Sequence, residues 1–155
     1  MSKMFGKPIK KQMFIKETAE KVYETITSGD GWNQFFTHSS EIDPKPGGKF
    51  VFRWKNWGPN FYTNEAEGLV VKAERPNLFS FQWYPIGKDN PTTIEFRLTE
   101  KYGGTVIELT EDGYTDSEES RQMILQCACG WSEALTLLKF YLESGVIYKQ
   151  PQKDL

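Results

Sequence analysis

A long helical pattern between residues 117 and 145 constrains the fold of this chain more than any other feature of its sequence. Its apolar residues recur at the three- and four-residue spacing of an amphipathic helix. Either Thr115 or Asp116 can cap the amides of its first turn, and Gly145 is a natural stop. At about 1.5 Å per residue the helix would be about 43 Å long, so we expect it to lie along the full length of a curved sheet. The apolar stripe consists of Ile124, Cys127, Trp131, Ala134, Leu135, Leu138, Tyr141 and Leu142.

Length and charge limit the classes of protein to which the chain can belong. The 155 residues fit one domain, in which about 70% of the unfolded surface can be buried. The formal net charge of -2 argues against binding to a phosphate backbone, since that function needs a clustered positive field. No apolar run approaches the roughly 20 residues of a membrane span, and the first residues contain no hydrophobic signal segment. We therefore expect a cytoplasmic protein that binds neither nucleic acid nor membranes.

The two cysteines, Cys127 and Cys129, are expected to be free thiols. They are two positions apart on the predicted helix, so their side chains point about 200° apart and a disulfide between them would distort it. Free thiols suit a reducing compartment. A zinc site would need two further ligands, and His38 is the single histidine of the chain. We expect no metal and no cofactor.

Before the long helix, the sequence is dominated by alternating patterns. Residues 9–16 are typical of a strand, followed by a short helix capped by Thr18 and an aromatic turn of helix at residues 32–36. Between residues 41 and 114 apolar and polar residues alternate, with turns rich in proline and glycine between the alternating runs. Strands joined by such short turns form an antiparallel meander. We expect these strands at residues 50–55, 65–74, 79–83, 94–99 and 106–110.

The sum of these elements is an α+β fold, in which the long helix covers the aromatic face of one antiparallel sheet. No linker, repeat or low-complexity segment divides the chain. We expect a single domain over residues 9–146, with flexible tails at residues 1–8 and 147–155.

A resemblance to a known family rests on runs that follow one another in this order: PGGKFVFRW from Pro46, EGLVVKAERP from Glu67, FSFQW from Phe79, GTVIELT from Gly104 with Gly113 after it, and GWSEALTLLKFYLE from Gly130. Their order and spacing are similar to those of the bacterial AHSA-like proteins, which are named for homology to the activator of the ninety-kilodalton heat-shock protein's ATPase. That family belongs to the START/SRPBCC helix-grip superfamily. The resemblance covers roughly residues 9–145.

The resemblance implies a helix-grip fold, a curved antiparallel sheet of about six to seven strands wrapped around a long C-terminal helix, with two short helices after the first strand. In many members of the superfamily a cavity between sheet and helix holds small hydrophobic molecules. Many relatives carry a histidine where Glu111 stands, a departure that changes the chemistry near the cavity mouth or leaves it unaffected. The eukaryotic activator also has a separate domain that engages the chaperone, which we do not expect here.

The aromatic residues allow two interpretations. Taken alone they would fill a core, because aromatic side chains bury large areas. A concave sheet closed by one helix is hard to fill completely, however, and the resemblance favours a partly open, mostly apolar cavity. Gly130 costs about 1 kcal/mol relative to alanine inside a helix, which suggests a close backbone approach or a slight bend there. The residues expected to line the cavity and bind a ligand are Trp32, Phe36, Phe52, Trp54, Phe81, Trp83, Phe96, Cys127 and Trp131.

We assign no catalytic residue. Any Ser-His or Cys-His arrangement would depend on His38, for which a surface or structural role is the more common one. Glu65 and Glu67 would enter the cavity and serve as acid or base if their face of the strand points inward. If the opposite parity, that of Ala66 and Val70, points inward, both carboxylates are solvated, and we favour this second arrangement.

These observations lead us to expect a noncatalytic, monomeric protein that binds a small hydrophobic or aromatic molecule, such as a lipid or a polyketide. One alternative is an enzyme of the polyketide cyclase kind that uses a cavity carboxylate as its base. Another is a chaperone-associated interaction module of the stress response, for which an exposed apolar patch would be the sign.

Overall fold

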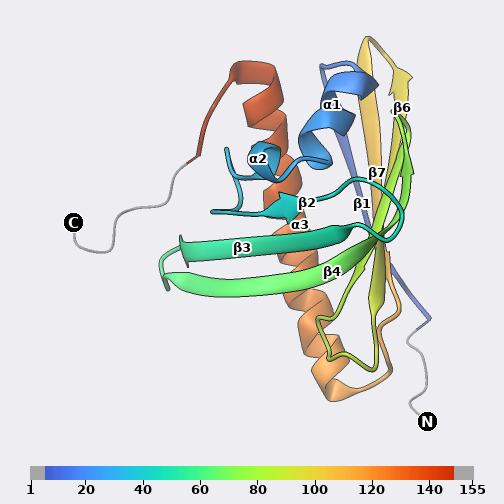
Figure 1. Ribbon diagram of the computed structural model, residues 1–155, viewed down its shortest axis with the longest axis vertical. Helices are drawn as coiled ribbons and strands as arrows, with labels where there is room; N and C mark the ends of the chain where they lie inside the picture. Colours follow the sequence, from blue (N-terminus) through green and yellow to red (C-terminus); the bar gives the residue numbers. More distant parts are fainter. Residues whose placement is uncertain (1–5, 149–155) are drawn as a thin grey trace.

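The computed structural model describes residues 6–148 and contains a seven-stranded antiparallel sheet with helices packed on one side of it (Figure 1). The strands follow the spatial order β1-β7-β6-β5-β4-β3-β2, so β3 to β7 form the expected meander. The α+β helix-grip fold predicted from the sequence is confirmed. In chain order the elements are β1 (Ile9–Ile15), α1 (Ala19–Ile26), α2 (Gly29–Trp32), β2 (Glu41–Ile42), β3 (Lys49–Trp57), β4 (Tyr62–Glu74), β5 (Leu78–Trp83), β6 (Thr92–Lys101), β7 (Gly104–Asp112) and α3 (Glu118–Ser144).

Helix α3 runs along the length of the molecule (Figure 1). Its 27 residues span about 40 Å. The N-cap is Ser117, whose side-chain oxygen accepts a hydrogen bond from the amide of Ser120, so the expectation that Thr115 or Asp116 would cap the helix is wrong. Asp116 instead forms an ion pair with an arginine of the first turn. Gly145 ends the helix in the left-handed conformation with φ 69°, as its position in the sequence predicted.

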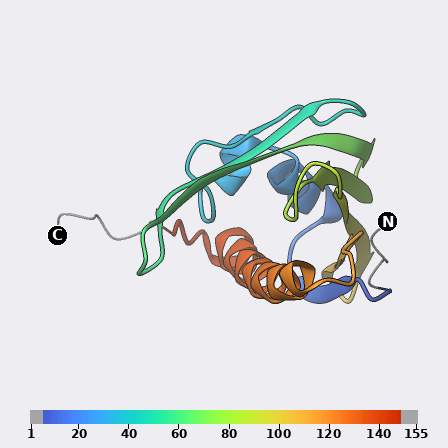
Figure 2. The same ribbon diagram turned by 90° about the horizontal axis from the view of Figure 1, so that it is seen from below.

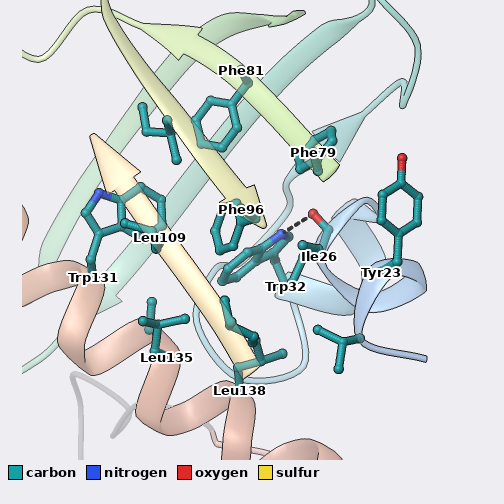
Figure 3. Close-up of a cluster of buried hydrophobic side chains, with 14 of the residues drawn as sticks. Tyr23, Ile26, Trp32, Phe79, Phe81, Phe96, Leu109, Trp131, Leu135 and Leu138 are labelled. Carbon is teal, nitrogen blue, oxygen red and sulfur yellow. Dashed lines mark hydrogen bonds between the residues drawn. The ribbon is translucent and has the colours of Figure 1, made fainter. Parts of the chain in front are cut away.

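The core lies on the concave side of the sheet, which also holds all three helices (Figure 2). Trp32 is its centre: the ring centroid lies 5.0 Å from that of Phe52 and 6.2 Å from that of Phe96. The indole N–H of Trp32 donates to the carbonyl of Ile26 at 2.8 Å, which satisfies the polar atom of this buried ring (Figure 3). Trp131 of α3 is 3% exposed, so its predicted burial against the sheet is confirmed.

The two ends of the sheet meet α3 differently. Along β1 the helix covers the outer strand edge: the Lys139 amine donates to the carbonyl of Phe14, and the Lys16 amide donates to the Glu143 carboxylate at 2.9 Å. Towards the other end, β3 and β4 form a long hairpin that crosses in front of the helix (Figures 1 and 2). The sheet and the helix are therefore packed directly together at one end only.

The predicted flexible tails include residues 1–5 and 149–155, which lie outside the described residues. Within the described part of the second tail, the Tyr148 amide donates to the carbonyl of Gln34 at 3.1 Å, and the Tyr148 ring lies 5.6 Å from that of Trp57. None of the helices within residues 6–148 is both long enough and apolar enough to cross a membrane.

Candidate ligand-binding cavity

A cavity of about 810 Å³ lies between α3, the β3–β4 hairpin and the loop that follows β5. This volume is within the range of ligand pockets, about 300–1,000 Å³. Helix α3 contributes one face, because its lining residues recur every three or four positions. Those residues are Met123, Gln126, Cys127, Gly130, Trp131 and Glu133. The aromatic side chains that complete the wall are Phe36, Trp54, Trp57, Tyr62, Trp83 and Tyr84.

The structure brings together only part of the predicted site. Phe36, Trp54, Trp83, Cys127 and Trp131 line the cavity. The other predicted residues, Trp32, Phe52, Phe81 and Phe96, are packed in the closed core and are at most 1% exposed.

Helices α1 and α2 explain this division. Helix α1 packs on β6 and β7, and helix α2 packs beside β2. Trp32 of α2 fills the concave face between them, with its ring centroid 5.0 Å from that of Phe52 and 6.2 Å from that of Phe96. Figure 3 shows Trp32 beside Phe96. The cavity lies farther along the concave side, where the β3–β4 hairpin faces residues 123–133 of α3.

Gly130 lies on the cavity face of α3. A Cβ atom added there would meet no heavy atom within 4 Å, so the close backbone approach suggested by the sequence is wrong. The missing side chain leaves space that belongs to the cavity.

Glu111, at the end of β7, is the residue around which the inner wall is built. Its side chain is fully buried and accepts hydrogen bonds from the indole N–H of Trp83 at 2.8 Å, the indole N–H of Trp131 at 2.9 Å and the hydroxyl of Thr92 at 2.6 Å. The two indoles come from β5 and α3, and their ring centroids are 5.5 Å apart with an interplanar angle of 33°. One carboxylate thus joins the sheet to the helix behind the cavity wall.

A signal for the burial of Glu111 was present in the sequence. Glu111 has the same strand parity as the buried Ile107 and Leu109, so alternation alone places it on the inner face. Sequence reasoning singled it out as a departure from relatives but did not assign its face. The partners could not be foreseen, because Trp83 and Trp131 reach it from elements distant in the chain.

Comparison with known families decides the relationship. Residues 16–143 match the family model described as Activator of Hsp90 ATPase homolog 1-like protein. The chain belongs to this family. The AHSA-like resemblance proposed from the sequence is therefore confirmed. No curated protein matches the chain in a sequence comparison.

Solved structures similar to this Activator of Hsp90 ATPase homolog 1-like chain share its fold. A protein from Staphylococcus saprophyticus is 24% identical with a TM-score of 0.72, and the match covers 94% of this chain and 98% of that one. The Aha1 dimer from Colwellia psychrerythraea is 23% identical with a TM-score of 0.76, covering 90% and 98%. CalU16 from Micromonospora echinospora is 22% identical with a TM-score of 0.69, covering 95% and 78%.

Cys127, the cysteine that lines the cavity, stays a protonated thiol near neutral pH. Burial raises the pKa of Cys127 to about 12, and the nearby Glu111 carboxylate acts in the same direction. Burial and then the charge of Glu111 also raise the pKa of the Tyr114 hydroxyl, which lies near Cys127. Both groups stay protonated near neutral pH, so neither is an activated nucleophile or base.

The other carboxylates near the cavity are turned to solvent. Glu65 and Glu67 border the cavity on β4 but are exposed, and Val70 on the opposite parity is buried, which is the arrangement we favoured. A hydrogen bond from Arg53, 2.9 Å away, holds the pKa of Glu65 below its usual value.

A third carboxylate, Glu133 of α3, also lines the cavity; it is exposed and accepts a hydrogen bond from the Trp57 indole at 2.8 Å. His38 is exposed and is not among the residues that line it. Within residues 6–148 no group of histidine, cysteine and acidic side chains has the arrangement needed to hold a metal ion.

Proposed function

We propose that this protein binds a small hydrophobic or aromatic molecule in the cavity and catalyses no reaction on it. The observation that carries the proposal is a cavity of about 810 Å³ in which seven of the nineteen lining residues are aromatic. Aromatic side chains on a cavity wall suit apolar ligands such as lipids and aromatic polyketides, with the polar side chains at the mouth free to meet a polar group of the ligand. The proposed ligand-binding residues are Phe36, Trp54, Trp57, Cys127, Gly130, Trp83 and Trp131.

The arrangement of acidic and nucleophilic groups supports a noncatalytic role. A general acid or base must come within hydrogen-bond reach of its substrate. Glu111 is buried behind the two indoles, and both of its oxygens already accept hydrogen bonds. Glu65 is engaged by Arg53 on the outer face of the sheet. A polyketide cyclase-like reaction, the enzymatic alternative, would need one of these carboxylates to turn into the cavity.

A second candidate function is that of a chaperone-associated interaction module. Phe140, Val146 and Ile147 are 51%, 45% and 53% exposed at the C-terminal end of α3, where the Val146 amide donates to the Phe140 carbonyl. Exposed apolar side chains that lie together are a common feature of protein-binding surfaces. We expect the protein alone not to stimulate an Hsp90 ATPase. A several-fold rise in ATP turnover would place this function first.

A thermal-shift screen tests the binding function. A ligand that binds the folded state alone stabilises it by RT ln(1 + [L]/Kd), about 2.7 kcal/mol at 100 times its Kd. For a chain of this length that is a rise in Tm of roughly 5–10 °C. The compounds to screen are flavonoids, fatty acids, sterols and aromatic polyketides, with tryptophan fluorescence as a second readout because Trp54, Trp57, Trp83 and Trp131 line the cavity.

Two matched variants on α3 make the screen specific. Gly130→Leu places an isobutyl group in the cavity, whereas Cys129→Leu adds a side chain of the same kind to the exposed face one position earlier. We expect Gly130→Leu to abolish the ligand-dependent rise in Tm and Cys129→Leu to retain it. The binding function is wrong if no compound raises the Tm of the unmodified chain. It is also wrong if a compound raises the Tm of Gly130→Leu as much as it raises the Tm of the unmodified chain.

A further inference from the structure

The inner wall of the cavity depends on a residue that does not line it. Trp83 and Trp131 are cavity residues, but they are only 8% and 3% exposed, and each is held from behind by Glu111. The two indoles bind different oxygens of the same carboxylate: Trp131 donates to Oε1 and Trp83 to Oε2. A planar, doubly engaged acceptor fixes the direction of both N–H groups and hence the orientation of both rings.

The polarity of the wall follows from this orientation. Because both indole N–H groups donate to Glu111, neither is left to pair with a ligand. The other polar group beside them is the thiol of Cys127, which is a weak donor and a weak acceptor. The strongly polar side chains of the lining are exposed to solvent and therefore lie at the mouth: Asn64, Glu65, Glu67, Lys88, Gln126 and Glu133.

We propose that Glu111 is a positioning residue that makes the inner wall a rigid, donor-free aromatic surface, so that the cavity selects aromatic molecules with a polar group at one end only. The ligand enters with its apolar ring against the wall formed by Trp83 and Trp131 and keeps its polar group at the mouth. This inference rests on the proposed binding function and adds the class and orientation of the ligand.

A pair of naphthalenes tests the selectivity. 2-Naphthol carries one hydroxyl group and can leave it at the mouth, whereas 2,6-dihydroxynaphthalene must bury a second hydroxyl against the inner wall. A buried hydroxyl without a partner is unfavourable, so we expect the unmodified protein to bind 2-naphthol about 10- to 100-fold more tightly. The two Kd values can be measured by quenching of tryptophan fluorescence or by calorimetry.

Conservative changes at Glu111 should reduce this ratio. In Glu111→Gln the amide nitrogen cannot accept a hydrogen bond, and in Glu111→Asp the shorter side chain cannot reach both indoles. In either variant one indole N–H loses its acceptor and becomes free to pair with the second hydroxyl of the ligand. We expect the ratio to fall to about one tenth of its original value or less.

Thr93→Val is the matched control. Thr93 lies next to Thr92 but accepts its hydrogen bond from Gln82 at 3.0 Å, and it contacts neither indole N–H. We expect it to leave the ratio unchanged, while a loss of stability alone would lower both affinities together in every variant.

The outcomes separate this inference from the proposed function. An unchanged ratio in both Glu111 variants, or an equal fall in Thr93→Val, overturns the role of Glu111. Failure of both naphthalenes to bind the unmodified chain overturns the proposed ligand class as well. If other compounds still raise the Tm in a manner that Gly130→Leu abolishes, the binding function itself stands.

Discussion

At the scale of single residues, the most unusual feature is a carboxylate placed in an aromatic interior. Burying an acidic side chain is unfavourable unless its oxygens are hydrogen-bonded. Glu111 meets this condition through Trp83, Thr92 and Trp131, which all donate to it. The two indoles depend on Glu111 in turn, because without it each indole N–H would be a buried donor without an acceptor. Removing any member should therefore cost more than the loss of one ordinary hydrogen bond.

Substitutions of Trp131 measure how much these hydrogen bonds to Glu111 contribute to stability. Trp131→Phe keeps an aromatic ring but leaves Glu111 one donor short, so we expect the free energy of unfolding to fall by about 1–3 kcal/mol in urea denaturation. Trp131→Ala also removes a large core side chain and should cost about 3–5 kcal/mol. Trp57→Phe is the control, because the Trp57 indole donates to the exposed carboxylate of Glu133 and should cost less than about 1 kcal/mol. A loss under about 1 kcal/mol for Trp131→Ala would mean that the helix face is assigned wrongly.

The two cysteines should differ sharply in reactivity. With its pKa raised to about 12, Cys127 has about one thiolate per ten thousand molecules at about pH 8. Cys129 is exposed on the other face of α3. We expect Cys127→Ser to react with a disulfide reagent quickly and Cys129→Ser to react slowly, with a rate that rises as the pH rises towards the pKa of Cys127. Both variants should react alike after unfolding in urea; comparable rates in the folded state would contradict the burial of Cys127.

At the scale of secondary-structure elements, α3 serves both the core and the cavity. Its second half packs Ala134, Leu135 and Leu138 into the core, while Met123, Cys127 and other residues mainly in its first half line the open space. Two glycines differ in how closely a neighbouring element approaches them. At Gly68 of β4 a Cβ atom would lie 1.9 Å from the carbonyl oxygen of Gln82, whereas at Gly130 it would meet nothing within 4 Å.

Alanine substitutions at these two glycines should have opposite signs. Gly130→Ala improves helix propensity without a clash, so we expect stability to rise by up to about 1 kcal/mol. Gly68→Ala forces β4 and β5 apart, and we expect it to cost at least about 1–3 kcal/mol. Chemical denaturation of both variants checks this. A destabilising Gly130→Ala would show that the helix is bent at this position, the second of the two arrangements that the sequence suggested.

The elements themselves were more predictable than their assignment to core or cavity. The period of α3 and the alternation of β3 to β7 are local patterns, and the predicted strands fall within the observed ones. β2 has two residues and no pattern of its own, so it was not predicted. The division of the aromatic residues depends on where α1 and α2 place Trp32, a tertiary contact that no local pattern encodes. Aromatic residues on one strand and on the same face, such as Phe52 and Trp54, consequently have different roles.

At the scale of the whole molecule, the sheet has two edges, and each is covered over part of its length, which limits pairing with another chain. Exposed strand edges are the usual route by which sheets associate. The edge at β1 is engaged by α3 through Lys139 and Glu143. At the other end, β2 pairs with Phe50 and Val51 of β3, and the backbone of Arg53 bonds to Ser40 and His38, so β3 is covered as far as Arg53. Residues 54–57 of β3 extend beyond these contacts.

The partial coverage of both edges leads to a prediction about assembly. The large exposed apolar side chains, among them Leu69, Tyr102, Leu125 and Phe140, are spread over β4, the β6–β7 turn and both halves of α3. A stable interface buries about 800 Å² per partner with a continuous apolar centre, which such a distribution does not favour. We therefore expect a monomer of 18.0 kDa in light scattering coupled to size exclusion. Twice that mass would contradict the prediction. In that case Phe140→Ser would test whether the interface lies on the C-terminal end of α3, where Phe140 and Val146 are exposed. A variant with the mass of a monomer would place the interface there.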